Sequence, residues 1–556
     1  MQGFDHRKYR PMAPLALTRR QWPEKTLSQA PRWASVDLRD GNQALLEPMS
    51  VAQKRRMWEL LVEVGFKEIE VGFPSASQPD YDFVRWLIEE NRIPEDVTIQ
   101  VLVQAREALI QRSFEALRGV RRAIVHVYNS TSTVQRERVF GMDRAGIKAM
   151  AVAGAQMVRD EAAKYPDSEW LFQYSPESFS NTEMDYAVEV CAAVMEVWQP
   201  SAERPCILNL PATVESSTPN VFADQVEYFC THLPNREAAI VSLHTHNDRG
   251  TAVAAAELGL LAGADRVEGT LMGNGERTGN MDIVTMAMNL YSQGIDPELN
   301  LANPDAIIET YTACTGLPVH PRHPWIGELV YTAFSGSHQD AIRKSLARQG
   351  EEEHWQVAYL PIDPRDIGRD YQAVIRVNSQ SGKGGVAFVM ERDHGLQLPR
   401  WMQVELAQIV QRESERRSSE VDSATIYQLF CEHFGVSDNP AAMGDYQLDR
   451  KGGVDVIAVQ WQIDGNSHRL QGEGEGAIAA FIAALEAHGG QRIAVVDYSE
   501  HAIGSGTDAE AVAYIQLNVD GRRVSGAARD HDTVSASLRA VVAAYNRVRM
   551  LQAQAA

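Results

Sequence analysis

Two histidines separated by a single residue, His244 and His246, end an apolar run near the middle of the chain. Side chains alternate between the two faces of a β-strand, so both imidazoles face the same way and can reach one metal ion. The apolar run covers residues 239–243, and an Ala-rich helical segment begins after Gly250. In a (β/α)8 barrel, this carboxyl end of a strand carries the chemistry. A pair of surface histidines in a turn is the alternative for so short a motif.

Asp40 is a third candidate metal ligand, because it ends the first predicted strand beside Arg39. In a closed barrel, the seventh-strand histidines lie only two strands away around the same rim. One carboxylate and two imidazoles, with open positions for water and substrate, suit a catalytic divalent ion. This mixed ligand set leaves Mg, Mn and Zn open. For Asp40 alone, a helix N-cap or a salt bridge with Arg39 is the commoner explanation.

A glycine-rich segment at residues 273–280, with the sequence GNGERTGN, follows the last predicted strand. Its glycine spacing does not fit the dinucleotide-binding fingerprint. Gly273 and Gly275 would let the backbone approach a ligand, and the last loops of such barrels often hold phosphate groups. A tight turn into the eighth helix is the alternative. Asn280 is a candidate to add an oxygen to the metal shell or to orient a bound water.

The elements that must position these residues alternate between short β-rich runs and longer helix-period segments, which predicts a parallel α/β barrel. Eight strand candidates cover residues 33–38, 68–73, 98–104, 123–128, 170–174, 206–210, 239–243 and 266–271. The helical candidates cover residues 52–64, 81–90, 106–117, 143–164, 182–198, 222–233 and 280–294. Eight units in about 260 residues match a (β/α)8 TIM barrel better than an open doubly wound sheet.

The chain is expected to hold four parts: an N-terminal arm, the catalytic barrel, connecting subdomains and a C-terminal domain, at residues 1–30, 31–325, 326–424 and 425–556. A Gly-rich hinge is expected near residues 381–385. It is not a P-loop, because no Ser or Thr follows Lys383.

The C-terminal domain contains an internal repeat. Strand pairs that turn at Asp464-Gly465 and at Asp520-Gly521 each precede a helix, at residues 477–487 and 533–544. Two ββα repeats predict a small α+β domain, with dimerisation and ligand sensing both open.

Composition limits the classes of partner and the cellular compartment that we expect for this protein. The formal net charge of -21 argues against nucleic acid or an anionic membrane surface as the main partner. The five cysteines include no CxxC pair, and a sparse, odd set fits a reducing cytosol. The chain has no run of 18 apolar residues and no apolar segment behind its basic start. We therefore expect a cytoplasmic protein.

The motifs together resemble the Claisen-condensing branch of the metal-dependent TIM-barrel lyases, and within it the 2-isopropylmalate synthase family. The resemblance runs from Trp33 to the C-terminal repeats. Its motifs are the first-strand Arg-Asp-Gly, the fifth-strand Glu177, and the segments 209–213, 244–248, 273–280, 331–341 and 378–385. One departure is Asn42, which stands where many relatives have Glu, so any role of that carboxylate is absent.

The resemblance implies that acetyl-CoA condenses with 2-oxoisovalerate and that the thioester is hydrolysed to 2-isopropylmalate and CoA, the first committed step of leucine biosynthesis. A divalent ion on Asp40, His244 and His246 would act as a Lewis acid, and a monovalent cation such as K is an expected activator. Arg39 would stabilise oxyanion charge and Thr213 would bind the substrate carboxylate. Glu177 would work near the acetyl group. The loop bearing Gly273, Gly275 and Arg277 would hold acetyl-CoA.

Residues outside the barrel are assigned by the same resemblance. His338 and Tyr359 would reach an active site, that of the partner subunit in a homodimer; a packed His and a core Tyr are the alternative. Leucine would bind in the C-terminal domain and inhibit the enzyme. Its pocket residues would be Gly476, Ile478, Ala479, Tyr498 and Ala502.

Other functions share part of this pattern. Citramalate and homocitrate synthases would use the same mechanism, although homocitrate synthases generally lack the C-terminal domain. A metal hydrolase would carry its His-x-His motif on the first strand rather than the seventh. A leucine sensor without enzyme activity would not need the metal ligands.

Overall fold

In the computed structural model, the chain forms two compact units, Met1–Val330 and Tyr331–Ala556. The residues that the structure describes are 8, 12, 15, 17, 19–350, 354–369, 383–417, 421–435, 441–463, 465–504 and 509–555. Every helix among them is too short or too polar to cross a membrane.

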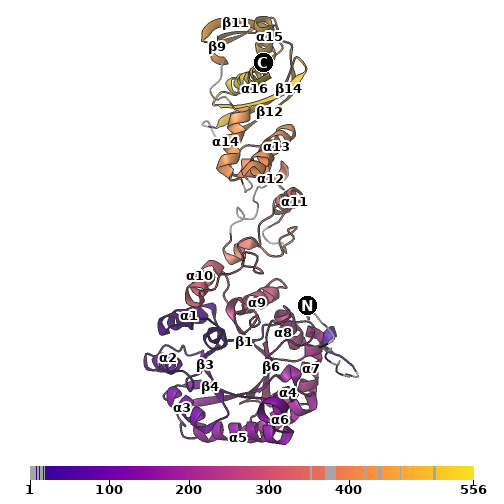
Figure 1. Ribbon diagram of the computed structural model, residues 1–556. Coiled ribbons are helices and arrows are strands. Elements are labelled where there is room, and N and C mark those ends of the chain that lie inside the picture. Colours follow the sequence, from indigo (N-terminus) through magenta and orange to yellow (C-terminus); the bar gives the residue numbers. More distant parts are fainter. Residues whose placement is uncertain are drawn as a thin grey trace. The chain divides into compact units, whose positions relative to one another are not determined.

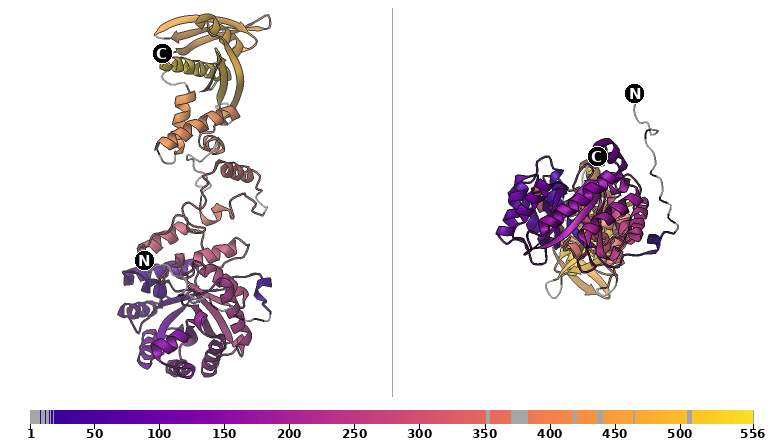
Figure 2. Two further views of the ribbon diagram at one scale, coloured as in Figure 1. Left: turned by 45° about the vertical axis from the view of Figure 1, so that its right-hand side comes forward. Right: turned by 90° about the horizontal axis from the view of Figure 1, so that it is seen from below.

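The first unit is a closed barrel of eight parallel strands surrounded by helices (Figures 1 and 2). The strands are β1 (Arg32–Ser35), β2 (Glu68–Gly72), β3 (Thr98–Gln104), β4 (Arg122–Ser130), β5 (Glu169–Glu177), β6 (Cys206–Ala212), β7 (Ala239–Thr245) and β8 (Arg266–Gly269). Strand β1 pairs with both β2 and β8, which closes the barrel. All eight predicted strands are present, and the predicted fold class is confirmed.

The helices of this unit follow the strands in turn. They are α1 (Val51–Val64), α2 (Gln78–Glu89), α3 (Glu107–Leu117), α4 (Thr133–Gln135), α5 (Arg144–Ala162), α6 (Met184–Trp198), α7 (Pro219–His232), α8 (Ala252–Leu261), α9 (Ile283–Tyr291) and α10 (Pro304–Thr315). Helix α1 begins at a capping box of Ser50 and Gln53. Helix α9 is shorter than predicted, because Asp282 caps its first turn through Thr285 and Asn280 pairs with His246 instead.

The first strand is also shorter than predicted. Strand β1 ends at Ser35, and Asp37–Gly41 forms one π-helical turn, closed by a hydrogen bond from Gly41 N to Val36 O of 3.1 Å. The Asp37 carboxylate accepts from Leu271 N at 3.1 Å, which draws the chain away from the strand direction. Arg39 and Asp40 therefore belong to a π-helical turn rather than to a strand end. Leu271 itself begins a 3-10 turn after β8 rather than ending the strand.

The described part of the N-terminal arm is attached to α7. Arg20 donates from Nε and Nη2 to the Asp224 carboxylate at 2.8 Å each, and Trp22 Nε1 donates to the same carboxylate at 2.9 Å. The backbone N–H of Gln21 donates to Glu227 Oε1 at 2.8 Å. Buried acidic side chains on the outer face of the barrel thus fix the end of the arm.

The second unit combines helices with two antiparallel sheets of three strands (Figures 1 and 2). Its helices are α11 (Gly336–Leu346), α12 (Lys383–His394), α13 (Arg400–Arg417), α14 (Ser423–Phe434), α15 (Ala477–Gly489) and α16 (Thr533–Ala555). Its strands are β9 (Ala441–Lys451), β10 (Val454–Ile463), β11 (Asn466–Gly474), β12 (Ile493–Ile503), β13 (Glu510–Val519) and β14 (Arg522–Asp530).

The two repeats are confirmed, but each carries a third strand, β9 or β12, so the unit is βββα rather than the predicted ββα. Asp520 and Gly521 both have positive φ, 47° and 85°, as a two-residue type I′ hairpin requires. Asp464, at the other predicted turn, lies outside the described residues. In the expected hinge, Ser381 and Gly382 also lie outside them, and the next three residues form the first turn of α12.

Candidate metal centre and active site

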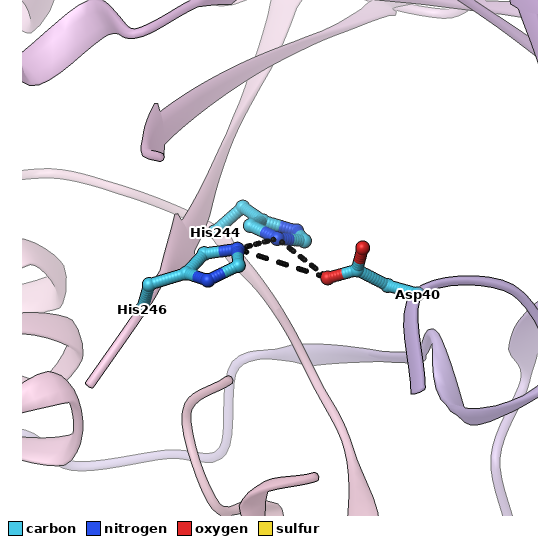
Figure 3. Close-up of side chains that lie close together, drawn as sticks. All are labelled: Asp40, His244 and His246. Carbon is cyan, nitrogen blue, oxygen red and sulfur yellow. Dashed lines mark hydrogen bonds and ion pairs between the residues drawn. The ribbon is translucent and has the colours of Figure 1, made fainter. Parts of the chain in front are cut away.

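Three predicted ligands meet at the mouth of the barrel (Figure 3). His244 Nε2 lies 3.1 Å from His246 Nε2 and 3.4 Å from Asp40 Oδ2, and His246 Nε2 lies 3.7 Å from the same oxygen. Ligands about 2.1 Å from an ion, at tetrahedral or octahedral angles, lie roughly 3.0–3.4 Å apart. All three residues are buried, and within the described chain Asp40 Oδ2 makes no well-formed hydrogen bond. The donor set fits a divalent ion.

Neighbouring charges shift the pKa values of the three candidate ligands. Burial acts to raise the pKa of Asp40, but the guanidinium of Arg39, 2.7 Å from Oδ1, and the two imidazoles hold it well below its usual range. Burial favours neutral His244, yet the nearby carboxylates of Asp40 and Glu268 raise its pKa to about 9. Burial and the nearby His244 lower the pKa of His246 to about 4. The carboxylate stays ionised, as a metal ligand must.

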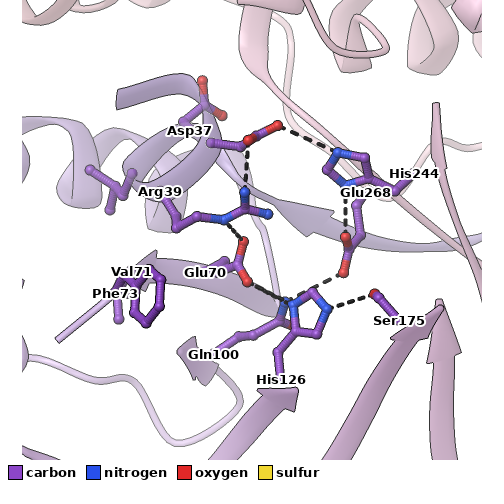
Figure 4. Close-up of polar contacts among 12 residues, drawn as sticks. Asp37, Arg39, Glu70, Val71, Phe73, Gln100, His126, Ser175, His244 and Glu268 are labelled. Carbon is purple, nitrogen blue, oxygen red and sulfur yellow. Dashed lines mark hydrogen bonds and ion pairs between the residues drawn. The ribbon is translucent and has the colours of Figure 1, made fainter. Parts of the chain in front are cut away.

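A buried polar network, which was not predicted from the sequence, lies beneath the candidate ligands (Figure 4). Arg39 Nε donates to Glu70 Oε2 at 2.5 Å, and Glu70 Oε1 lies 2.9 Å from His126 Nδ1. His126 Nε2 lies 2.7 Å from Ser175 Oγ. Figure 4 also shows Glu268, whose Oε2 lies 2.9 Å from His244 Nδ1. The only sequence signal for these residues is a polar side chain inside an apolar strand.

A cavity of about 260 Å³ opens above the ligands. Its lining includes the predicted residues Arg39, Asp40, Glu177, Thr213, His244, His246 and Arg277. The lining that was not predicted comprises Gln43, Leu102, His126, Tyr128, Ser175, Asn209, Pro211 and Glu276. One small chamber therefore brings most of the predicted barrel residues together around the ligands.

Glu177 and Thr213 enter this chamber from neighbouring strands. Glu177 ends β5, and its Oε2 accepts a hydrogen bond from Ser130 Oγ. Thr213 follows β6, and its Oγ1 accepts from the backbone N–H of Ser178 at 2.9 Å. That contact uses the Thr213 oxygen as an acceptor and leaves its hydroxyl hydrogen to donate to a ligand.

The glycine-rich loop is packed against the metal ligands. Asn280 Nδ2 donates to Asn274 O at 2.9 Å, while its buried Oδ1 has no partner among the described residues. A Cβ on Gly275 would overlap the Asn280 amide, so the glycine is needed for packing and not only for access to a ligand. Arg277 donates from Nε to Asp248 Oδ1 at 2.6 Å, and its Nη2 lies 3.1 Å from His246 Nδ1.

Comparisons with known proteins decide the family. Residues 30–310 match the HMGL-like family, residues 328–391 the alpha-isopropylmalate synthase post-catalytic domain-like family, and residues 420–549 the LeuA allosteric (dimerisation) domain. A 2-isopropylmalate synthase of Rhodospirillum rubrum is 55% identical over 549 residues, 98% of each chain. Those of Azotobacter vinelandii and Pseudomonas savastanoi are 54% and 53% identical over 547 and 552 residues, at least 98% of each chain. The chain belongs to the 2-isopropylmalate synthase family.

His338 and Tyr359 lie in the second unit. The resemblance to 2-isopropylmalate synthases assigned both residues to an active site. The rings of His338 and Tyr359 stack, with centroids 4.0 Å apart and planes 25° apart. Tyr359 is 60% exposed, so it is not the core tyrosine of the alternative interpretation. Their contact with a reaction centre stays a prediction.

The leucine-pocket residues expected of a 2-isopropylmalate synthase lie at two places in the second unit. Gly476 caps α15, and Ile478 and Ala479 lie in its first turn. Tyr498 and Ala502 lie on β12, and the Tyr498 hydroxyl is 2.7 Å from Ser537 Oγ. A cavity of about 390 Å³ in this unit is lined by other residues. The leucine site therefore stays a prediction.

Proposed function

We propose that the barrel mouth joins the methyl carbon of acetyl-CoA to the ketone carbon of 2-oxoisovalerate and then hydrolyses the thioester, releasing 2-isopropylmalate and CoA. This is the first committed step of leucine biosynthesis and makes the protein an acyltransferase. The single observation that carries the proposal is the buried cluster of Asp40, His244 and His246, in a chain whose full-length relatives are named 2-isopropylmalate synthase.

A divalent ion would be held by Asp40, His244 and His246, with Asn280 Oδ1 as a further oxygen ligand. Two buried oxygens without a hydrogen-bond partner in the described chain, Asp40 Oδ2 and Asn280 Oδ1, support this set. When bound, the ion supplies Lewis-acid polarisation of the keto-acid oxygens. Mg is our first choice, with Mn and Zn as alternatives, and K is proposed as a monovalent activator.

The chain's own residues would bind and orient the substrates. The Thr213 hydroxyl would donate to the keto-acid carboxylate, because its oxygen is already fixed by Ser178 N. Arg39 is held by Glu70 and Asp40 and would stabilise the developing alkoxide from a fixed position. Glu177 lines the same cavity and would act on the acetyl methyl group.

Acetyl-CoA would approach over the loop that contains Gly273, Gly275 and Arg277. His338 and Tyr359 would act from the partner subunit of a homodimer, as a base or as water-activating groups in thioester hydrolysis. The match of residues 420–549 to a dimerisation domain supports the dimer. All five cysteines are free thiols, which supports a place in the reducing cytoplasm. Nucleic acid and membranes are not proposed as partners.

The test is the release of free CoA from acetyl-CoA, followed with a thiol reagent in the presence of Mg or Mn. Testing 2-oxoisovalerate, pyruvate and 2-oxoglutarate separately distinguishes this enzyme from citramalate and homocitrate synthases, which the relatives' names do not support. Strong preference for 2-oxoisovalerate is expected. If none of the three keto acids supports CoA release, the proposal is refuted.

Leucine is proposed as a feedback inhibitor that binds near Gly476, Ile478, Ala479, Tyr498 and Ala502. The same assay with leucine tests this regulation. Suppression of CoA release by leucine, and its loss in an Ala479→Trp variant that fills the expected pocket, are the expected results. Equal inhibition of the wild type and the Ala479→Trp variant would mean that leucine binds elsewhere.

A further inference from the structure

Lys54 is a buried cation on α1, close to the candidate metal centre in sequence and space. Its side chain is 1% exposed. Its Nζ donates to Asp80 Oδ1 at 2.5 Å, to Leu38 O at 3.0 Å and to Val71 O at 3.4 Å. An ammonium has three hydrogens, so these three acceptors use its whole donor capacity.

The Leu38 and Val71 carbonyls lie in two irregular backbone segments next to the site. Leu38 lies in the π-helical turn, immediately before Arg39. Val71 is the extra residue of an irregularity in β2, because the pairing with β3 passes from Glu70 directly to Gly72. A π-helical turn and a β-bulge both leave backbone groups without their usual partners. Lys54 provides a partner for one carbonyl at each.

Asp80 completes this arrangement from α2. Its Oδ1 accepts from Lys54, and its Oδ2 accepts from the backbone N–H of Phe73 at 2.8 Å. Gly72 packs so closely on Asp80 that a Cβ there would overlap its carboxylate. Backbone at both ends of the irregular β2 segment is therefore tied to the same buried ion pair.

The side chains next to these carbonyls in sequence contact one another in the site. Arg39 and Asp40 follow Leu38, and Glu70 precedes Val71. Arg39 links the two segments through Glu70 Oε2 at 2.5 Å, and it also donates to its neighbour Asp40 Oδ1 at 2.7 Å. A buried ion pair seldom stabilises a fold more than apolar packing would. Stability alone therefore does not explain why the Lys54–Asp80 pair lies between these segments.

We propose that Lys54 is a positioning residue, which sets the Asp40 carboxylate and the Arg39 guanidinium for metal and substrate by fixing the Leu38 and Val71 carbonyls. The inference rests on the proposed function, because it assigns to Lys54 a role in that same site. Lys54 lines neither the ligand cluster nor the cavity and acts only through the backbone.

The experiment is the affinity of the full-length protein for Mn²⁺, measured by the electron paramagnetic resonance signal of the free ion. The double variant Lys54→Met with Asp80→Asn removes the ion pair without leaving a buried charge, and the amide oxygen that replaces the carboxylate can still accept from the Phe73 N–H. We expect a Kd at least 10-fold higher, the size of effect seen when groups behind metal ligands are removed. We also expect kcat to fall while the KM for acetyl-CoA stays within threefold.

Two further variants separate positioning from general stability. Asp80→Asn alone leaves the Lys54 nitrogen beside both carbonyls, where even a neutral amine has a hydrogen for each, and should bind Mn²⁺ within threefold of the wild type. Asp224→Asn removes the buried carboxylate that holds the N-terminal arm, 1% exposed, and should lower the melting temperature without changing Mn²⁺ affinity.

If the double variant does not fold, Lys54→Arg takes its place. That change keeps the charge and the pairing with Asp80 but moves the donors relative to the carbonyls, and should raise the Kd at least threefold. An unchanged Kd in whichever variant folds overturns the role of Lys54 and leaves the proposed function standing. Failure of the wild type to bind Mn²⁺ would overturn both.

Discussion

Glu268 Oε2 lies 2.9 Å from His244 Nδ1, on the side of the ring opposite to the ligand cluster. A carboxylate at this distance holds the hydrogen on Nδ1 and leaves Nε2 as the basic nitrogen that faces Asp40 and His246. Glu268 is itself held by Arg266 Nη1 at 2.7 Å, and charge from Arg266 and His244 outweighs burial to keep its pKa well below the usual range. The barrel interior thus orients a candidate metal ligand.

Glu268→Gln is expected to weaken metal binding by about 10- to 100-fold, because the amide can no longer fix the His244 tautomer as an ionised acceptor does. The measurement is Mn²⁺ titration by calorimetry, with activity followed as Mn²⁺ is raised. Activity should recover in part at saturating metal. A Kd within twofold of the wild type would contradict the role of Glu268 behind His244.

Glu177→Gln is expected to lower kcat by about 10²- to 10⁴-fold, because the amide cannot accept a proton from the acetyl group. Mn²⁺ affinity should not change, since Glu177 is not among the clustered ligands. Glu276→Gln is the matched control, because Glu276 lines the same cavity. Equal losses of kcat in the two variants would show that Glu177 has no special part in the chemistry.

Thr213→Val is expected to raise the KM for 2-oxoisovalerate by about 10-fold or more, as the loss of a hydrogen bond to a charged group is worth about 1.5–3 kcal/mol. The KM for acetyl-CoA should stay nearly constant, and Thr213→Ser, which keeps the hydroxyl, should behave like the wild type. Steady-state kinetics with each substrate varied in turn provides the comparison. A KM increase confined to acetyl-CoA would reassign the residue.

The ligand cluster could be predicted because two general rules fix it. Strand alternation puts His244 and His246 on one side, and barrel closure brings Asp40 to them although 204 residues separate it from His244 in sequence. The structure confirms both results. The eight strands were predicted for a related reason: parallel strands covered on both faces are short, continuous apolar runs between helices.

The turn that presents Asp40 could not be predicted, because distant partners determine it. Leu38 extends an apolar pattern that favours a strand, whereas in the structure the π-helical turn is held by Leu271 N, which donates to Asp37, and by Lys54, which donates to Leu38 O. The polar network is similar. Glu70, His126 and Glu268 interrupt apolar strands visibly, but a single sequence does not reveal which of them contact one another.

The third strand of each C-terminal repeat was missed because its alternation between apolar and polar residues is weak. Strand β9 begins with three consecutive apolar residues, 441–443, followed by Gly444, so its alternation is weak. Strand β12 carries exposed valines, Val495 and Val496, at consecutive positions, and its pairing with β13 is irregular between Val495 and Asp497. Central strands β10 and β13 alternate clearly, and their tight turns marked the repeat.

Asp37 predicts a pH dependence of barrel stability. Burial raises its pKa to about 7, although hydrogen bonds from Ser35 and Leu271 favour the charged form. Well below pH 4 the carboxyl is protonated in both the folded and the unfolded chain. As pH rises from about 4 to 7, the unfolded chain loses the proton first, so the folded state loses relative stability, by up to about 4 kcal/mol at 1.36 kcal/mol for each pKa unit.

Asp37→Asn removes this titration while its amide can still pair with Leu271 N and with the Ser35 hydroxyl, which can accept as well as donate. The variant should therefore gain stability relative to the wild type as pH rises from 5 to 8. Calorimetric melting of both proteins across this range measures the difference between their transition temperatures. A constant difference would mean that Asp37 is ionised in the folded barrel throughout, with its charge stabilised by the Leu271 N–H and the Ser35 hydroxyl.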